Sequence, residues 1–192
     1  MTMKRTNSND FKTSTLAGGC FWCTEAIFKR LKGVVEVTSG YTGGSVKNPM
    51  YEDVLTGQTR HVEAVQIKYN PNIISFEKLL DIFWATHDPT TLNRQGTDVG
   101  SQYRSAIFYH SAEQKHIAEA SKLSQEKSGK LNSKIVTEIK PFEKFYTAEE
   151  YHQKFFDRNP DYPYCSIIIA PKVQKLLEKF NGEVKEEYKE NF

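Results

Sequence analysis

Residues 18–25 read GGCFWCTE, and they place a cysteine where a strand is expected to give way to a helix. The glycines allow a sharp turn and a close backbone approach, and apolar residues recur at about helical spacing at Phe21, Phe28 and Leu31. Cys20 is therefore expected at a helix N-terminus, where unpaired backbone amides favour the thiolate and lower the pKa of a thiol. The stretch predicts a reactive cysteine; the plainer alternative is a cysteine buried beside aromatic side chains.

The composition is typical of one globular domain with a substantial core, because 38% of the 192 residues are hydrophobic and 12% are aromatic. We expect a flexible N-terminal segment over residues 1–11 and a single catalytic domain over residues 12–170. Residues 171–192 are expected to form an extension that is partly helical and then frayed. A formal net charge of +2, without a basic cluster among aromatic residues, gives no argument for nucleic acid as a partner.

Membrane insertion and secretion are not expected either. No segment approaches the roughly 20 apolar residues of a membrane span, and residues 1–10 lack the apolar run of a secretory signal. The three cysteines are an odd number and too few to cross-link a domain of this size, so their use is expected to be chemical. These observations predict a cytoplasmic protein.

The hydrophobic patterns predict an α+β fold. The expected strands are residues 12–17, 33–38, 61–69 and 103–109, and the expected helices are residues 21–32 and 76–84. Two β-α-β units in this order indicate a ferredoxin-like two-layer α/β sandwich with a split βαβ core. The long connections at residues 40–60 and 86–102 are expected to be active-site loops.

The second half of the chain is expected to add elements to this core, including C-terminal helices. Capping boxes at residues 111–114 and 147–150 predict two helix starts, and residues 134–139 can add a strand. Pro171 is expected to open an amphipathic helix. Cys165 comes before it, in a turn-prone segment.

Glu63 is a candidate for a carboxylic acid that stays protonated near neutral pH. The two-residue period of the expected strand puts it on one face with Val65, Ile67 and Tyr69. An apolar neighbourhood raises the pKa of a carboxyl group because burial penalises the charged form. A surface carboxylate at a strand end is the alternative.

Several motifs together resemble one known family. GCFW at residues 19–22, followed by Glu25, resembles the active-site signature of the A-type peptide methionine sulfoxide reductases, in which the cysteine attacks the sulfoxide sulfur. The similarity covers about residues 16–171, and its further segments are GYTGG (40–44), NPMY (48–51), TRHVE (59–63), HDPT (87–90), RQGTD (94–98), SQYRS (101–105), YHQ (151–153) and NP (159–160). Motifs found together in one order are far more specific than a single motif.

The resemblance implies reduction of methionine-S-sulfoxide, free or in oxidised proteins, with thioredoxin or another dithiol as the reductant and no cofactor or metal. The implied site residues are Cys20 as nucleophile, Glu63 as acid, Tyr51 and Tyr103 as hydrogen-bond donors to the sulfoxide oxygen, and Asp98 as a further polar residue. Reduction of a sulfoxide by a thiol also needs an apolar niche for the methyl group, which Phe21 and Trp22 can line.

A second thiol is needed to recycle Cys20, because the attack leaves a sulfenic acid there. The resemblance favours Cys165, since the resolving thiol of the family commonly lies just past an Asn-Pro turn, and a turn-rich segment can swing over the site. Cys23 is the alternative, although its Cα, about 5 Å from that of Cys20 by helical rise, permits a disulfide only with some strain. The chain departs from the family at both places: Cys23 often corresponds to a glycine, as does Pro163 in Pro163-Tyr164-Cys165.

Two rival readings use the same cysteines. Cys20-x-x-Cys23 can be the dithiol of a general thiol-disulfide oxidoreductase, although no thioredoxin-like strand order is evident. A structural zinc site can be built from Cys20, Cys23, Cys165 and a histidine such as His61, because closed zinc sites have four such ligands. The second close pair of ligands that such sites usually have is missing.

Overall fold

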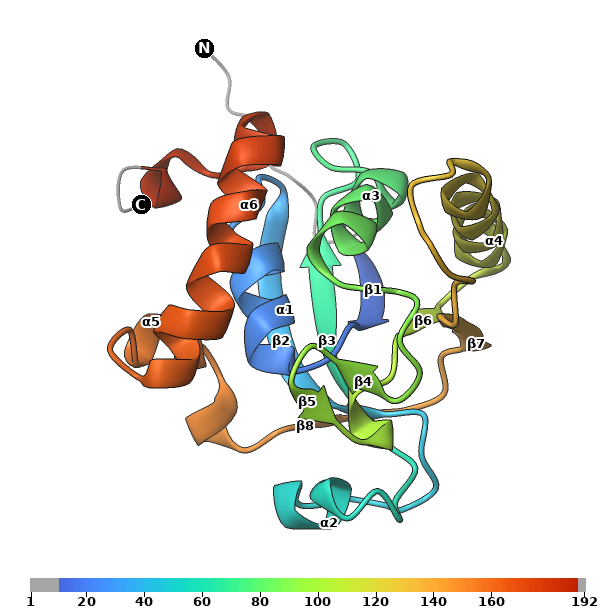
Figure 1. Cartoon of the computed structure of the whole chain (residues 1–192), viewed down its shortest axis with the longest axis vertical. Helices are drawn as coiled ribbons and strands as arrows, with labels where there is room; N and C mark the ends of the chain where they lie inside the picture. Colours follow the sequence, from blue (N-terminus) through green and yellow to red (C-terminus); the bar gives the residue numbers. More distant parts are fainter. Residues whose placement is uncertain (1–10, 190–192) are drawn as a thin grey trace.

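β1 (Lys12–Ala17) and β3 (Val62–Tyr69) pair at the centre of a six-stranded sheet in the computed structural model, which describes residues 11–189 (Figure 1). The order is β7-β6-β1-β3-β2-β8, with β2 at Val34–Thr42, β6 at Ala106–Tyr109, β7 at Glu138–Pro141 and β8 at Phe145–Thr147. Neighbouring strands are antiparallel except for β6 and β7, which are parallel. A separate hairpin of β4 (Arg94–Gln95) and β5 (Asp98–Val99) lies between β3 and β6 along the chain.

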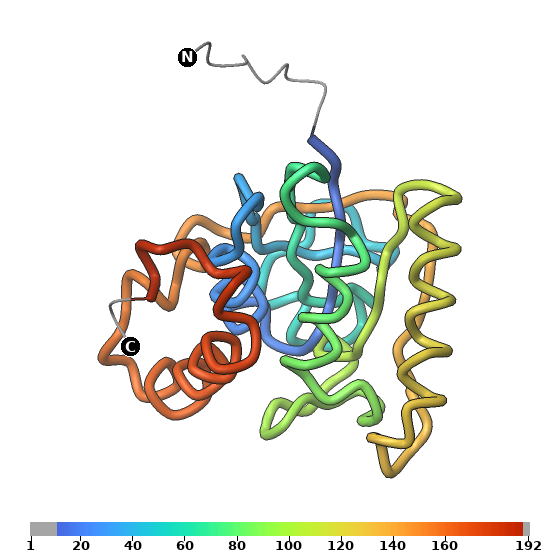
Figure 2. Tube along the Cα trace, turned by 90° about the horizontal axis from the view of Figure 1, so that it is seen from above, coloured from blue at the N-terminus to red at the C-terminus, as the bar shows by residue number. Residues whose placement is uncertain are grey.

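Helices cover one face of this sheet (Figures 1 and 2). The longer helices are α1 (Phe21–Lys29), α3 (Phe76–Thr86), α4 (Ala112–Lys127) and α6 (Ala170–Phe180), and the short ones are α2 (Tyr51–Leu55) and α5 (Phe155–Arg158). α6 packs against α1 and α3, and α4 packs against α3, β6 and β7. The structure is therefore a mixed α/β arrangement with a helical layer on a sheet, as the sequence predicts at this level.

The central strand β3 is buried on both faces at its start. Glu63, Val65, Ile67 and Tyr69 are all buried, and the last three belong to the main core under the helices, as the two-residue period predicts. On the opposite face, a smaller cluster is formed by Ala17, Val62, Ala64, Ala106 and Phe108, with Phe142 and Phe145 packed against it. The chain leading into β8 therefore covers the second face, and Glu63 faces the helices in the interior.

The expected cap at Ser111 is confirmed, because its side-chain oxygen accepts a hydrogen bond from the Gln114 N–H (3.1 Å). Ser75 caps α3 in the same way through the Lys78 N–H (3.2 Å). The capping box expected at residues 147–150 is wrong. Thr147 ends β8, and the next N–H donates to Ser39 O, so the chain stays extended and only a 3₁₀ turn, Glu150–His152, follows. Strand pairing prevails there over the local helix signal.

Three strand boundaries also differ from the sequence prediction. β2 runs on to Thr42 because Gly40 lets β8 approach closely; a Cβ at Gly40 would lie 2.4 Å from the Phe145 ring. β6 begins at Ala106, since a 3₁₀ turn over Ser101–Tyr103 takes up the expected start of the strand. β7 likewise begins at Glu138 instead of residue 134.

The chain beyond Tyr164 is helical from its start. The turn expected before Cys165 is confined to residues 160–162, and a π-helical turn over Cys165–Ile169 leads directly into α6. Residues 181–188, expected to fray, form two 3₁₀ turns, and Val184 makes a β-bridge to Leu31 beside α1. The remaining expectations for the ends, at residues 1–10 and 190–192, lie outside the described residues. Between residues 11 and 189, no helix is long and apolar enough to cross a membrane.

Candidate active site

Cys20 lies at the N-cap of α1, directly after the turn that follows β1. Its own backbone is not helical (φ −54°, ψ 125°), while its carbonyl oxygen accepts hydrogen bonds from the N–H groups of Cys23 (3.1 Å) and Thr24 (3.4 Å). Gly19 makes the turn with φ of +90°, a conformation that favours glycine, and a Cβ there would lie 2.5 Å from the Gln95 side chain. The predicted strand-to-helix turn is confirmed.

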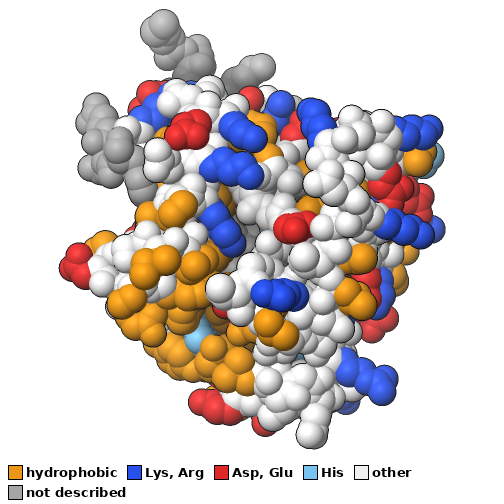
Figure 3. Space-filling view, in the orientation of Figure 1, with side chains coloured by type: hydrophobic (Ala, Val, Ile, Leu, Met, Phe, Trp, Pro, Cys, Tyr) orange, Lys and Arg blue, Asp and Glu red, His pale blue; other side chains and the backbone are white. Residues whose placement is uncertain are grey.

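A cavity of about 260 Å³ opens beside this turn. It brings together the sequence-predicted residues Cys20, Phe21 and Trp22 from the start of α1, Tyr51 from α2, Glu63 from β3, Asp98 from β5 and Tyr103 from the following turn. Tyr162 and Tyr164, which the sequence analysis did not place in the site, complete the lining. Figure 3 shows hydrophobic side chains gathered at the lower left of the molecule, over α5 and below it.

Glu63 is held against the turn that carries the cysteine. Its side chain is 2% exposed, and its Oε2 accepts a hydrogen bond from the Phe21 N–H at 3.0 Å. Burial raises the pKa of Glu63 to about 8, although the Phe21 N–H acts in the opposite direction. A carboxyl group with this pKa is mostly protonated at neutral pH, so it can donate a proton into the cavity.

The thiol of Cys20 differs from the sequence expectation in its ionisation. Burial raises the pKa of Cys20 well above its ordinary value, and a side-chain hydrogen bond to Cys23 and the neighbouring Glu63 act in the same direction. The helix N-terminus was expected to lower this pKa. Removal of the sulfur from water outweighs the helix dipole here, so Cys20 holds its proton in the resting state.

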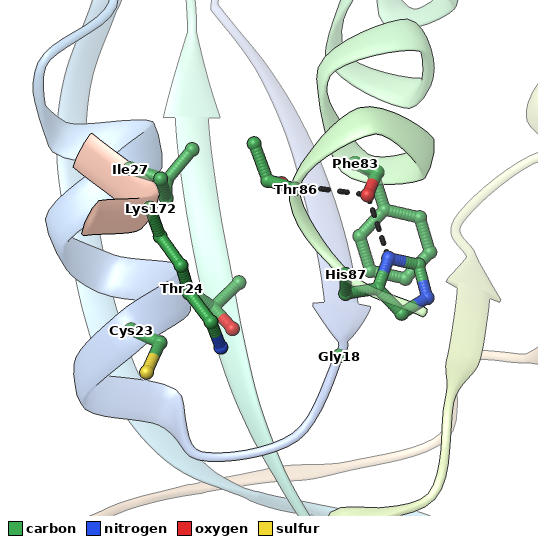
Figure 4. Close-up of a pocket in the computed structure, with 8 residues that line it drawn as sticks. All are labelled: Gly18, Cys23, Thr24, Ile27, Phe83, Thr86, His87 and Lys172. Atoms are coloured by element: carbon green, nitrogen blue, oxygen red, sulfur yellow. Dashed lines mark hydrogen bonds between the residues drawn. The ribbon is translucent and has the colours of Figure 1, made fainter. Parts of the chain in front are cut away.

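Cys23 is the thiol of this pair that ionises first. Its side-chain hydrogen bond with Cys20 lowers its pKa to about 7 against the effect of burial, and the charge of Lys172 contributes in the same direction. Cys23 does not line the substrate-sized cavity; it lines a second cavity of about 10 Å³ between α1, the end of α3 and α6 (Figure 4). Its Sγ also lies 3.8 Å from the Tyr164 hydroxyl.

The tyrosines of the cavity keep their protons and can act as hydrogen-bond donors. Burial raises the pKa of Tyr51 to about 12 and raises the pKa of Tyr103 still further. Tyr164 donates a hydrogen bond to Asp98 Oδ2 at 2.6 Å, and burial raises its pKa as well. Asp98 is thus tied to a residue of the cavity wall, while Tyr51 and Tyr103 face the space beside Cys20.

Two residues that support the site were not assigned roles from the sequence. His152 accepts a hydrogen bond from the Trp22 indole N–H at 3.1 Å, and its ring centre lies 4.5 Å from that of Tyr51. Glu25 accepts a hydrogen bond from the Lys154 N–H through both carboxylate oxygens at 2.9 Å. The sequence could have pointed to both residues, because Glu25 and His152 each lie in a motif that resembles the reductase family.

Cys165, the expected resolving thiol, is fully buried at the start of the π-helical turn, and burial raises its pKa. It does not line the substrate-sized cavity. A swing over the active site would therefore require this helical turn to open.

The zinc site considered from the sequence is not assembled. His61 uses both ring nitrogens within its own loop, where Nδ1 accepts from the Gly44 N–H at 3.0 Å and Nε2 lies 2.7 Å from Val46 O. In the described part of the chain, no group of three or more His, Cys, Asp or Glu side chains can hold a metal ion.

Comparisons with known proteins agree with this geometry. The family described as peptide methionine sulfoxide reductase matches residues 12–185. The peptide methionine sulfoxide reductase MsrA of Sulfolobus acidocaldarius is 58% identical over 170 residues, which are 88% of this chain and 95% of the relative. That of Thermus thermophilus is 53% identical over 169 residues, 88% of this chain and 95% of the relative.

Solved structures show the same relationship. The reduced form of Mxr1 from Saccharomyces cerevisiae matches with a TM-score of 0.75 and 39% identity, covering 84% of this chain and 92% of that one. Methionine sulfoxide reductase A of Corynebacterium diphtheriae matches with a TM-score of 0.72 and 34% identity, covering 80% of this chain and 77% of that one. Mxr1 has also been solved in complex with Trx2. That structure matches with a TM-score of 0.53 and 31% identity, covering 80% of this chain and 90% of that one. By sequence and by structure, this chain belongs to the peptide methionine sulfoxide reductase family.

Proposed function

We propose that this enzyme reduces methionine-S-sulfoxide, free or in oxidised proteins, with Cys20 as the nucleophile and Glu63 as the acid. The observation that carries the proposal is the placement of both groups in one cavity, where Glu63 is bound to the N–H of the residue that follows Cys20. A sulfur nucleophile and a protonated carboxyl group facing the same cavity are the pair that transfer of a sulfoxide oxygen needs.

In the proposed step, the Cys20 sulfur attacks the sulfoxide sulfur while Glu63 protonates the sulfoxide oxygen. Tyr51 and Tyr103 donate hydrogen bonds to this oxygen, and Phe21 and Trp22 form the apolar niche of the methyl group. The oxygen is transferred to Cys20 as a sulfenic acid, and methionine leaves. The proton released by the Cys20 thiol restores Glu63, so the step needs no outside proton.

A second thiol, Cys23 or Cys165, then converts the sulfenic acid into a disulfide. A thioredoxin or another dithiol reduces this disulfide; support comes from the structure of the relative Mxr1 in complex with Trx2. The cycle needs electrons only from thiols, so we propose that it uses no cofactor and no metal. A cytoplasmic location suits the three free cysteines, which a reducing compartment maintains.

We also propose that the core is a ferredoxin-like sandwich. The order β6-β1-β3-β2 within the sheet, with α1 and α3 as the two crossing helices, supports this description. In that description, β7, β8, α4 and α6 are additions around the split βαβ unit.

The function is tested by incubating the reduced protein with each epimer of a methionine sulfoxide peptide in the absence of reductant. We expect at least one methionine per enzyme from the S-epimer and none from the R-epimer. Cys20→Ser should abolish the product without loss of fold, since a hydroxyl oxygen is a far weaker nucleophile than a cysteine sulfur. Turnover of the serine variant within tenfold of the unaltered protein would contradict the assignment.

The alternative, a general disulfide oxidoreductase that uses Cys20 and Cys23, predicts rapid reduction of insulin disulfides with little sulfoxide reduction. The same purified protein can be assayed for both reactions. The apolar niche and the protonated Glu63 favour the sulfoxide, because disulfide exchange needs neither of them.

A further inference from the structure

The small cavity between α1, the end of α3 and α6 places a lysine beside a thiol that the proposed sulfoxide attack does not use. Buried Cys23 lines this cavity together with Lys172 from the first turn of α6. Figure 4 shows the Lys172 side chain passing Ile27 and ending near Thr24 and Cys23. A volume of about 10 Å³ leaves space for about one water molecule at most in this cavity, while Lys172 itself is only half-buried.

Two charged residues, Asp88 and Lys175, line a wider cavity of about 350 Å³ together with Lys172, on which the Cys23 sulfur acts from the small cavity. Among the ion pairs found within residues 11–189, none involves Lys172. His87, the other titratable group of the small cavity besides Cys23, does not compete, because burial lowers its pKa to about 4 and keeps it neutral. A partly buried ammonium group is stabilised by a nearby anion, and Cys23 can provide one.

The remaining groups that face Cys23 do not supply a competing charge near neutral pH. They are Cys20 and Tyr164, which hydrogen-bond to it, and Glu63 and Cys165, which act on it through space. The pKa values of all four are raised, so each of them is mainly neutral when Cys23 begins to ionise. The hydrogen bond with Cys20 lowers the pKa of Cys23 most, and the positive charge of Lys172 adds to that effect.

We propose that Lys172 is a positioning residue of the recycling step, where it holds Cys23 as the thiolate that resolves the sulfenic acid on Cys20. The inference rests on the proposed function, which supplies that sulfenic acid. It also assigns the first disulfide to Cys23 instead of Cys165, which is buried away from the substrate cavity.

The backbone of the first helical turn suits this disulfide. The strain expected for two cysteines one helical turn apart assumes that both residues are helical, but Cys20 is an N-cap residue with extended ψ. Its side-chain direction can adjust without breaking an intrahelical hydrogen bond of its own N–H group. Each of the two cysteine side chains shifts the pKa of the other, so they face the same space.

The proposed step is balanced in atoms and electrons. The Cys23 thiolate attacks the sulfur of Cys20–SOH, an S–S bond forms, and the S–O bond breaks. The oxygen leaves with its hydrogen and takes one further proton from water that enters the cavity after methionine departs. The two sulfurs become a disulfide, and the oxidation equivalent comes from the sulfoxide of the first step.

The test measures the rate of disulfide formation against pH after one turnover with methionine-S-sulfoxide, in a Cys165→Ser protein that can form only the Cys20–Cys23 bridge. We expect this rate to rise with pH as Cys23 ionises. Lys172→Met should move the midpoint up by about one pH unit, because a nearby cation stabilises the charged form by about this amount. The two rates should converge at high pH, where Cys23 is ionised in both proteins.

Matched variants separate charge from packing. Lys172→Arg should restore the pH midpoint of the unaltered protein, because it keeps the positive charge. Lys175 is an exposed residue one turn further along α6, and Lys175→Met should leave the midpoint unchanged. An unchanged midpoint in both Lys172→Met and Lys172→Gln would overturn the proposal. So would peptide mapping of the unaltered protein after one turnover if it showed a Cys20–Cys165 bridge with Cys23 still open to alkylation; this mapping needs no variant to fold.

The yield of methionine in the same experiment reports on the proposed function alone. A yield of about one methionine per enzyme with an unmoved midpoint rejects the role of Lys172 and leaves the reductase mechanism standing. Absence of methionine from the unaltered protein rejects the proposed function itself.

Discussion

The carboxyl group of Glu63 and the backbone N–H of Phe21 are joined by a hydrogen bond of 3.0 Å, which fixes the acid to the turn that carries Cys20. The acid comes from the central strand of the sheet and the cysteine from the start of the first helix. Their separation is therefore set by the packing of α1 on β3 in the core, and not by a mobile loop.

Glu63→Gln is expected to slow methionine formation by about 10²–10⁴-fold, the usual effect of losing a general acid. The amide can still accept the Phe21 N–H, so the turn should keep its geometry. Single-turnover production of methionine measures the chemical step directly. Glu36→Gln, on an exposed residue of β2, is the control and should have no effect; an unchanged rate for Glu63→Gln would show that the proton has another source.

The pH dependence of methionine formation should show the protonated form of Glu63 as the active one. Because burial raises its pKa to about 8, the acid carries its proton below that pH and loses it above. We expect the single-turnover rate to fall as pH rises through about 8, and the fall to be absent from the residual rate of Glu63→Gln. A rate that falls equally in both proteins would assign the titration to another group.

The sequence was sufficient to predict the site because the motifs name its residues one by one. Cys20, Glu63, Tyr51, Tyr103 and Asp98 meet in one cavity although they come from separate segments of the chain. The alternation in residues 61–69 also identified the inward face of β3 correctly, since a one-residue shift would have turned Glu63 to the other face.

The misjudged features depend on contacts between distant parts of the chain. The high pKa of Cys20 follows from its burial under residues far along the sequence, which a helix N-terminus signal does not reveal. The capping box at residues 147–150 was overruled by pairing with β2, and the turn signals of Pro163 did not show that the following residues continue into α6. Lys172 had no motif, and only the packing of α6 on α1 brings it to Cys23.

Tyr51→Phe and Tyr103→Phe should each slow methionine formation by about 2–10-fold, which corresponds to the loss of one neutral hydrogen bond. The double variant should lose more than the sum of the two free-energy effects if each tyrosine partly replaces the other. Single-turnover rates of the two single variants and the double variant form the necessary cycle. Tyr109→Phe, outside the cavity, is the matched control; strictly additive effects would contradict the shared role.

Glu25 should make the stability of the fold depend on pH. Burial raises its folded pKa to about 7, above the ordinary carboxyl value of 4.5, so the stabilising effect of its bound proton is complete below 4.5 and is lost as pH rises through 7. Glu25→Gln removes this dependence, because the amide does not ionise. The free energy of unfolding of the variant should therefore increase relative to that of the unaltered protein as pH rises from 4.5 to 7, with a slope of at most about 1.4 kcal/mol per pH unit.

Urea titrations over this range measure the difference between the two proteins. The titration of Glu63 contributes equally to both proteins and cancels. Glu126→Gln, exposed on α4, should follow the unaltered protein at every pH; a flat difference for Glu25→Gln would mean that Glu25 is ionised in the fold throughout.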